Sequence, residues 1–181
     1  TTTVAAPEKP PLAGKVIKIG VVEPITGPLA AFGATGIAGV KLAAEEINAR
    51  GGVLGAKIEL LIEDFRGDTK VAVAAAEKLI TVDKVTAIMG TFSSAAALAM
   101  GPVPEKYKIP FVTIGCSADT LVEQGWKYFF GITPRQSAFN RVTLRFVKEV
   151  INPKTLSQFN ENTLFGVDSA KWTRKIAEEY G

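Results

Sequence analysis

A strand–helix–strand unit near the start of the chain constrains its fold more than any other feature. Val16–Val22 is almost uniformly apolar and rich in β-branched residues, which is typical of a strand buried on both faces of a sheet. Gly36–Asn48 repeats apolar residues at helical spacing, and Gly51 and Gly52 end that helix. Lys57–Asp64 follows at once as a second strand. A helix that crosses between two strands favours parallel pairing, so the unit predicts an α/β protein.

The same alternation continues along most of the chain. The further predicted elements are a helix capped by Asp68 or Thr69, a strand over Val85–Met89, a helix capped by Ser93 or Ser94 that runs to Met100, a strand over Ile109–Ile114, a short crossing strand over Tyr128–Ile132 and a helix over Gln136–Val150. This order indicates a Rossmann-like, doubly wound parallel sheet. If its first strands take the order 2-1-3-4, the strand order reverses between the first and third strands.

The last of these helices carries an apolar stripe, which we expect to face inward. The members of the stripe are Phe139, Val142, Phe146 and Val150. Beyond this helix the alternation stops, because Lys154–Thr163 is too polar for a buried strand. A final helix is predicted over Val167–Tyr180.

The composition excludes several classes of function. The 181 residues contain no histidine, which removes Ser-His and Cys-His nucleophile pairs and His-bound metals. The net charge is only +3, and the densest basic face (Arg141, Arg145, Lys148) is better explained as a solvated helix surface than as a nucleic-acid site. No stretch approaches the roughly 20 apolar residues of a membrane span. Residues 1–14, rich in Thr, Ala and Pro, are expected to form a tether.

A ligand is expected at the carboxyl ends of the strands, where open α/β sheets bind their ligands at the reversal of strand order. The loops at that point are Glu23–Thr35, Gly90–Ser94 and Gly115–Asp119. They carry hydroxyl groups and two aromatic rings, on Thr26, Thr91, Ser93, Ser94, Ser117, Phe32 and Phe92. Hydroxyls and free N–H groups at helix starts favour a small anion such as a carboxylate. Helix capping is the better explanation for each serine alone. For the cluster from three loops, ligand binding explains the hydroxyls as well as capping does.

Other kinds of site fit the sequence less well. The glycines after the first strand lack the G-x-G-x-x-G spacing of a dinucleotide site, and no G-x-x-x-x-G-K-[ST] motif occurs. Glu63, Asp64 and Asp68 match no calcium loop and are better explained as a strand end and a helix cap. Cys116 has no basic neighbour that would activate it. We therefore predict no catalytic residue, no bound metal and no cofactor.

Five segments in succession carry a resemblance to a known family. They are Ile19–Gly39 (IGVVEPITGPLAAFGATGIAG), Ala43–Gly55 (AAEEINARGGVLG), Lys57–Asp68, Gly90–Ala95 (GTFSSA) and Ile109–Gly125 (IPFVTIGCSADTLVEQG). Together they resemble the leucine/isoleucine/valine-binding proteins, which are type I periplasmic binding proteins of ABC importers. Each segment alone is weak evidence, whereas the ordered series is specific. The resemblance runs from about Val16 to Gly181 and implies two Rossmann-like lobes that close on a ligand.

The resemblance implies roles for single residues. Phe32 would cover the ligand side chain, Ser94 and the serine before it would hold an α-carboxylate, and Phe165 would face the cleft from the second lobe. Cys116 and Ala118 stand where the family uses main-chain and small polar contacts, and they reduce the number of hydroxyls there. With the hydroxyl of the third loop added, the predicted ligand-binding residues are Phe32, Ser93, Ser94, Cys116, Ser117, Ala118 and Phe165.

The resemblance also implies how the chain divides. Residues 15–132 would be the N-terminal segment of a first Rossmann-like lobe, and residues 133–181 the incomplete start of a second lobe. The strand that the family places just before Asn160 is missing or replaced. The later half of the family pattern, with its ammonium-binding acid, is missing too. We therefore expect this chain to be an incomplete N-terminal part.

The function that follows is binding without chemistry. We expect an extracytoplasmic protein, periplasmic or at the cell surface, that delivers a small carboxylate to the permease of an ABC transporter. A branched-chain or other apolar amino acid is the first candidate, and the membrane would be reached only through a lipid tether. The alternatives are a ligand-sensing domain of a receptor or regulator with the same fold, and a binder of aromatic or aliphatic acids or amides. An α/β enzyme is disfavoured, because no acid–base pair is evident.

Overall fold

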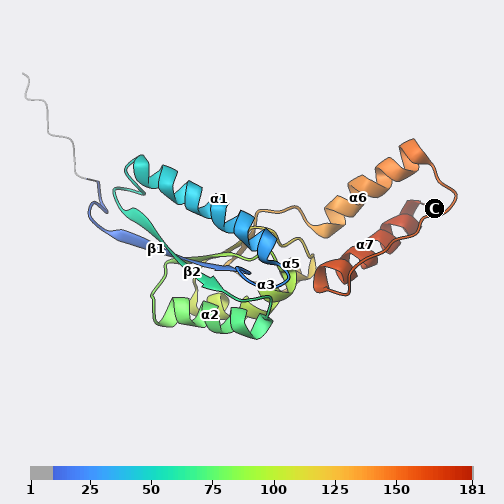
Figure 1. The fold of residues 1–181 in the computed structure, drawn as a ribbon. Helices are drawn as coiled ribbons and strands as arrows, with labels where there is room; N and C mark the ends of the chain where they lie inside the picture. Colours follow the sequence, from blue (N-terminus) through green and yellow to red (C-terminus); the bar gives the residue numbers. More distant parts are fainter. Residues whose placement is uncertain (1–9, 181) are drawn as a thin grey trace, which may run out of the picture.

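A five-stranded parallel sheet organises the computed structural model, which describes residues 10–180 (Figure 1). Its strands are β1 (Val16–Glu23), β2 (Lys57–Asp64), β3 (Ala87–Gly90), β4 (Phe111–Thr113) and β5 (Phe129–Gly131). The strand order is β2-β1-β3-β4-β5, and each neighbouring pair is parallel. The first four strands thus have the order 2-1-3-4 on which the placement of the ligand loops depends, and the predicted crossing strand is the edge strand β5.

Helices cover both faces of this sheet, as a doubly wound fold requires (Figure 1). They are α1 (Ala30–Ala49), α2 (Thr69–Thr81), α3 (Ser94–Met100), α4 (Pro102–Tyr107), α5 (Thr120–Glu123), α6 (Gln136–Phe146) with a π-helical extension over Val147–Ile151, and α7 (Leu164–Tyr180). Helix α1 lies on one face, and α2 and α3 lie on the other. The main core is on the second side, around the fully buried Phe65, Leu79, Ile88 and Met100. Asp68 caps α2 by accepting the Lys70 N–H (2.7 Å), as predicted.

Part of the predicted tether forms a turn that lies beside the turn before β2. Residues 1–9 of that prediction lie outside the described residues. Within Pro10–Gly14, the Leu12 N–H donates to the Leu54 carbonyl (2.9 Å). This part is therefore attached to the body of the protein through the turn before β2.

Helix α1 begins at Ala30, six residues earlier than predicted, so the predicted loop Glu23–Thr35 is wrong at its C-terminal end. Glycines in this stretch suggested a loop, because glycine weakens helices. The structure shows why glycine is needed inside the helix. A Cβ atom at Gly33 would overlap the Pro24 carbonyl oxygen, and one at Gly36 would lie 3.0 Å from Ile114 Cδ1. Close packing of α1 on the end of β1, and not chain flexibility, explains these glycines.

The pair of glycines at 33 and 39 provides a test of this packing. Gly33→Ala should lower the free energy of unfolding by about 2 kcal/mol or more, because the helix or the Pro24 turn must move. Gly39→Ala, in the same helix with nothing within 4 Å of its added Cβ, should raise it by about 1 kcal/mol through helix propensity. Urea denaturation followed by circular dichroism measures both. Equal effects of the two substitutions would contradict the close approach.

Helices α6 and α7 form a parallel pair beyond the carboxyl ends of the strands (Figure 1), since Gln136 meets Ser169 at one end of the pair and Lys148 meets Tyr180 at the other. The inward stripe predicted for α6 is wrong: its four members, Phe139, Val142, Phe146 and Val150, are between 46% and 72% exposed. The buried side chains of α6 are Gln136, Asn140 and Leu144. Asn140 Nδ2 donates to the Ser169 carbonyl (2.7 Å), so polar groups take part in the contact between α6 and α7. Sequence periodicity located the apolar face, but within residues 10–180 no element covers it.

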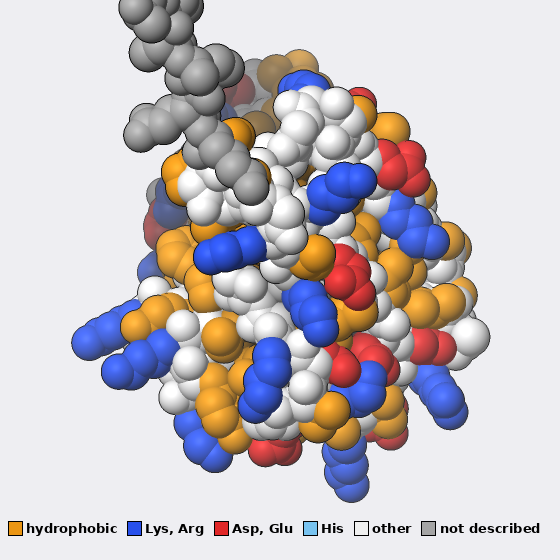
Figure 2. Space-filling model, turned by 90° about the vertical axis from the view of Figure 1, so that its left-hand side faces the viewer, with side chains coloured by type: hydrophobic (Ala, Val, Ile, Leu, Met, Phe, Trp, Pro, Cys, Tyr) orange, Lys and Arg blue, Asp and Glu red, His pale blue; other side chains and the backbone are white. Residues whose placement is uncertain are grey.

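Two features of the structure concern binding to nucleic acid and to a membrane. Figure 2 shows the face at the amino ends of the strands, where Lys and Arg are scattered among acidic and apolar side chains and do not form one patch. Within residues 10–180, no helix is long and apolar enough to cross a membrane. The extended segment Lys154–Thr163 forms no strand, in agreement with its polar sequence.

Candidate functional site

A hollow of about 480 Å³ opens where the carboxyl ends of the strands approach the start of α7. It combines residues from the start of α1, the loop between β3 and α3, the end of β4 and the segment that leads into α7. Its lining residues are Leu29, Phe32, Gly67, Thr69, Phe92, Ser93, Ser94, Ala95, Gly115, Glu161, Thr163 and Phe165. We call this site the aromatic hollow. Four of the seven predicted ligand-binding residues line it: Phe32, Ser93, Ser94 and Phe165.

Two stacked phenyl rings form one wall of the aromatic hollow. Phe32 and Phe92 lie with ring centroids 4.1 Å apart and planes 7° apart. Phe32 is half exposed because the first turn of α1 carries it over the end of the sheet, and Phe92 reaches it from the loop after β3. Phe165, in the first turn of α7, adds a third ring from the other side. These rings give the hollow an apolar surface for an aliphatic or aromatic group.

The two serines of the hollow have different surroundings. Ser93 caps α3, since its Oγ accepts the Ala96 N–H (3.3 Å), so the capping explanation is confirmed for this residue. A serine hydroxyl that accepts one bond can still donate its own proton. Ser94 is nearly fully buried at the start of α3 and also lines the hollow. The pair therefore places two hydroxyls beside the aromatic wall.

Cys116, Ser117 and Ala118 are buried outside the lining of the aromatic hollow. Ser117 Oγ donates to Gln136 Oε1 (3.0 Å), and Cys116 Sγ donates to the Thr91 carbonyl (2.9 Å). Burial, and then the charge of Glu23, raises the pKa of the Cys116 thiol to about 12, so it stays protonated and unreactive at neutral pH. The role of these three residues as ligand contacts stays a prediction.

A buried polar network attaches α7 to the sheet and so places Phe165 over the hollow. The Asp119 N–H donates to Asp168 Oδ2 on α7 (2.7 Å), and Asp119 Oδ2 accepts the Ser137 N–H at the start of α6 (2.9 Å). Burial is the largest effect on Asp168 and raises the pKa of its carboxyl. Because buried polar groups are costly when unpaired, this network holds the helix pair in one orientation.

Glu23 is the residue beneath the site that the sequence analysis did not single out. It ends β1 and is fully buried. Its Oε2 accepts the Phe92 N–H (3.3 Å), while Oε1 has no hydrogen-bond partner among the described residues. Burial raises the pKa of this carboxyl to about 7, against the opposing effect of the Phe92 N–H. The available signal was an acidic residue directly after an apolar strand, in the sequence Val21-Val22-Glu23.

Glu23 makes stability depend on pH in a predictable direction. The folded protein keeps the Glu23 proton up to about pH 7, whereas the unfolded chain loses it near pH 4.5. Between these values the folded state binds more protons, so its stability falls as pH rises. As pH rises through this window, the unfolding free energy of Glu23→Gln minus that of the native protein should therefore increase by about 3 kcal/mol. Urea denaturation from pH 4 to pH 8 measures it.

The control for this prediction is Glu63→Gln, which removes a carboxylate at the surface of the neighbouring strand β2. Glu63 pairs with Lys78 (2.6 Å) at an exposed position, where ion pairs contribute little. Its stability profile should follow that of the native protein from pH 4 to pH 8. Parallel profiles for Glu23→Gln and the native protein would contradict a raised Glu23 pKa.

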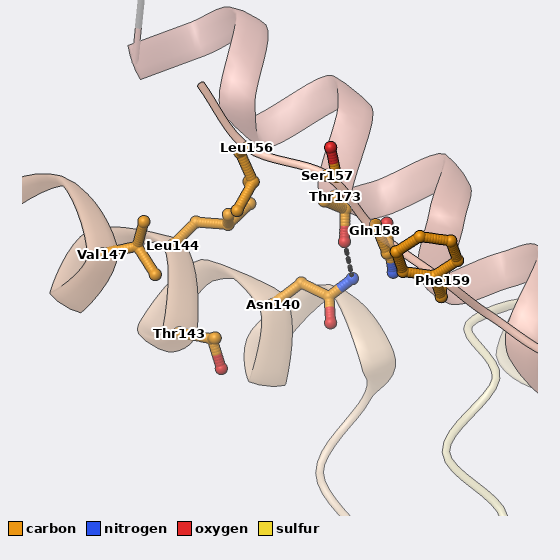
Figure 3. Close-up of a pocket in the computed structure, with 9 residues that line it drawn as sticks. All are labelled: Asn140, Thr143, Leu144, Val147, Leu156, Ser157, Gln158, Phe159 and Thr173. Atoms are coloured by element: carbon orange, nitrogen blue, oxygen red, sulfur yellow. Dashed lines mark hydrogen bonds between the residues drawn. The ribbon is translucent and has the colours of Figure 1, made fainter. Parts of the chain in front are cut away.

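A second hollow, of about 330 Å³, lies between α6, α7 and the extended segment before α7 (Figure 3). Asn140 reaches across it and donates through Nδ2 to Thr173 Oγ1 (3.0 Å). Its lining residues, none of them charged, are Asn140, Thr143, Leu144, Val147, Leu156, Ser157, Gln158, Phe159 and Thr173. Phe159 on its rim is 96% exposed. Since this hollow offers no ionic group, the aromatic hollow is the better candidate for a charged ligand.

Comparison with known proteins identifies the family of this fold. A family profile described as "Periplasmic binding protein" matches residues 16–181. The chain belongs to the periplasmic binding protein family. It is 33% identical over 173 residues to the Leu/Ile/Val-binding protein homolog 7 of Brucella suis biovar 1, a match that covers 91% of this chain and 43% of the relative. The predicted relationship to the leucine/isoleucine/valine-binding proteins is confirmed.

Solved structures of periplasmic binding proteins confirm the fold class. The leucine-binding protein LivK of Thermotoga maritima is 30% identical with a TM-score of 0.84, covering 91% of this chain and 46% of that protein. The branched-chain amino acid binding protein LivJ of Streptococcus pneumoniae, in complex with isoleucine, is 31% identical with a TM-score of 0.84. That match covers 89% of this chain and 46% of LivJ. The chain thus spans under half the length of the relatives it matches.

Proposed function

We propose that this chain acts in an extracytoplasmic solute-binding protein that delivers a small carboxylate to an ABC importer. A branched-chain or other apolar amino acid is the first candidate ligand. The aromatic hollow carries this proposal, because three aromatic rings and two serine hydroxyls line one space at the edge of the sheet. Its volume of about 480 Å³ lies within the range of small-molecule sites. The isoleucine bound to the related LivJ supports the choice of ligand.

The polar groups of the hollow suit the two charged ends of an amino acid. The hydroxyls of Ser93 and Ser94 would donate to the carboxylate. Glu161, the one charged side chain among the residues that line the hollow, would pair with the ammonium group alongside the acid that the resemblance places in the later half of the family pattern. Thr163 Oγ1 donates to Glu161 Oε1 (2.7 Å) and so orients this carboxylate. The phenyl rings would then contact the aliphatic side chain.

Closure of two lobes would explain how a ligand is retained. In this proposal residues 15–132 belong to the first lobe and residues 133–181 to the second. Phe165 and Glu161 come from the second part, while Phe32 and the serines come from the first. A ligand that bridges them favours the closed arrangement by its contacts with both sides.

The remaining parts of the proposal follow from the family. The partner would be the permease of an ABC transporter, and the location would be the periplasm or the cell surface, with the N-terminal segment as a tether. The protein would bind its ligand without changing it. The Cys116 thiol, protonated and buried, offers no nucleophile for such chemistry.

Ser94→Ala tests the carboxylate contact. L-Leucine added to the ¹⁵N-labelled protein should shift the amide signals of Phe92–Ser94 and Phe165 in NMR spectra. Loss of one hydrogen bond to a charged group should weaken this binding by roughly tenfold or more in Ser94→Ala. The matched control is Ser157→Ala, which removes a serine from the second hollow and should leave the affinity unchanged. Shifts confined to the second hollow would overturn the assignment of the site.

Glu161→Gln tests whether the ligand is an amino acid or a simple acid. The substitution should weaken L-leucine, which carries an ammonium group, and leave 4-methylpentanoate, which lacks one, nearly unaffected. Equal losses for both compounds would show that Glu161 does not bind the ammonium group. No binding of any carboxylate would count against the proposed function as a whole.

A further inference from the structure

The buried carboxyl group of Glu23 lies directly beneath the loop that presents the serines. Its Oε2 accepts a hydrogen bond from the Phe92 N–H. Phe92 stacks on Phe32 and directly precedes Ser93 and Ser94 in the chain. The unpartnered Oε1 of Glu23 occupies space that two glycines leave open. A Cβ atom on Gly90 would lie 3.1 Å from Oε1, and one on Gly36 would lie 3.7 Å from it. The fold therefore accommodates an acidic side chain between α1 and this loop.

The surroundings of Glu23 provide little to balance a negative charge. The buried residues of α1 are Gly33, Val40 and Ala44, which are all uncharged. On β2, Asp64 is acidic and already accepts the Ile25 N–H (2.9 Å). After β4, Cys116 is a protonated thiol.

One cation, Arg135, acts on Cys116 and is not among the groups that shift the pKa of Glu23. Arg135, whose charge reaches Cys116, lies over the Phe129 ring (5.8 Å) on β5. Among the described residues no cation shifts the pKa of Glu23, and a fully buried carboxylate with one oxygen unpaired is an unfavourable state. The protonated acid suits this geometry better, so the protonation state of Glu23 responds to any further charge placed nearby.

We propose that Glu23 is a positioning residue for the loop Thr91–Ser94, and that binding of a carboxylate at Ser93 and Ser94 is coupled to uptake of one proton by Glu23. This inference rests on the proposed function for its ligand. The proton comes from solvent and forms an O–H bond on the Glu23 carboxyl, and no other bond changes. Glu23 would not touch the ligand; it would act through the Phe92 N–H.

Two opposing effects decide the direction of the coupling. Ionised Glu23 accepts the Phe92 N–H more strongly than the neutral acid does, which would stiffen the loop. That bond is long at 3.3 Å, so the gain is modest. Ionised Glu23 also places a like charge beneath the bound carboxylate, which disfavours having both charged. The repulsion dominates, so carboxylate affinity falls as pH rises through neutrality.

The first experiment needs no ligand. The amide signal of Phe92 in the ¹⁵N-labelled protein should shift with pH around a midpoint near 7, because its acceptor titrates. In Glu23→Gln, which keeps the shape and an acceptor oxygen, this transition should disappear. The control Glu63→Gln should retain it. A Phe92 signal that does not titrate between pH 5 and pH 9, or an unchanged midpoint in Glu23→Gln, would overturn the inference.

The second experiment uses L-leucine. Its dissociation constant should rise by about fivefold from pH 6 to pH 8 in the native protein, as expected when binding raises a midpoint near 7 by about one pKa unit. In Glu23→Gln the dissociation constant should stay near its low-pH value throughout. Calorimetry near pH 7 in buffers of different ionisation enthalpy should show net proton uptake in the native protein only. Identical pH profiles for the two proteins would overturn the coupling.

The outcomes separate this inference from the proposed function. L-leucine could fail to bind while the Phe92 signal titrates near pH 7 in the native protein and not in Glu23→Gln. In that case the positioning role stands and the proposed function is weakened. If L-leucine binds with no dependence on pH, the proposed function stands and the coupling is wrong. Glu23→Leu removes the acceptor and so distinguishes positioning of the loop from a general role in stabilising the fold. A positioning role predicts weaker L-leucine binding at every pH, with residues remote from the loop unshifted in the spectra.

Discussion

Parallel pairing of β1 with β3 is the interaction on which the rest of this structure depends. The register aligns Val22 with Gly90, so both strands end at the same level of the sheet. Glu23 therefore lies beside the loop that follows β3 and can accept the Phe92 N–H. The same alignment brings Phe32, from the helix after β1, against the ring of Phe92. A change of register would separate the aromatic wall from the buried carboxyl group that supports it.

Buried hydrogen bonds join the sheet to the helix pair α6 and α7. Gln136, Asp119 and Asp168 are all buried and all paired. Directional bonds of this kind favour one orientation, whereas an apolar contact tolerates sliding. They bring the start of α7, with Phe165, to the edge of the sheet. The candidate site therefore depends on polar groups that do not themselves line it.

The sequence predicted most of the fold and named four of the residues that line the aromatic hollow. Apolar runs and helical spacing are local properties, so they located the strands and most helices to within a few residues. The start of α1 was missed because Gly33 resembles a loop residue until its contact with Pro24 is known. The exposure of Phe139 on α6 was missed because periodicity identifies an apolar face but not its partner. Glu23 was passed over, since its burial follows from elements distant in the chain.

The sequence by itself determined the α/β alternation, the parallel sheet, the family and the loops that meet at one edge, because these follow from short-range patterns. Only the tertiary structure decided which residues of those loops share a space. It placed Phe32 and Ser94 in the lining of the aromatic hollow, whereas the Ser117 hydroxyl donates a hydrogen bond to Gln136. The physical reason is that burial and hydrogen bonding depend on contacts between distant segments. A sequence pattern states only which side chains are available for such contacts.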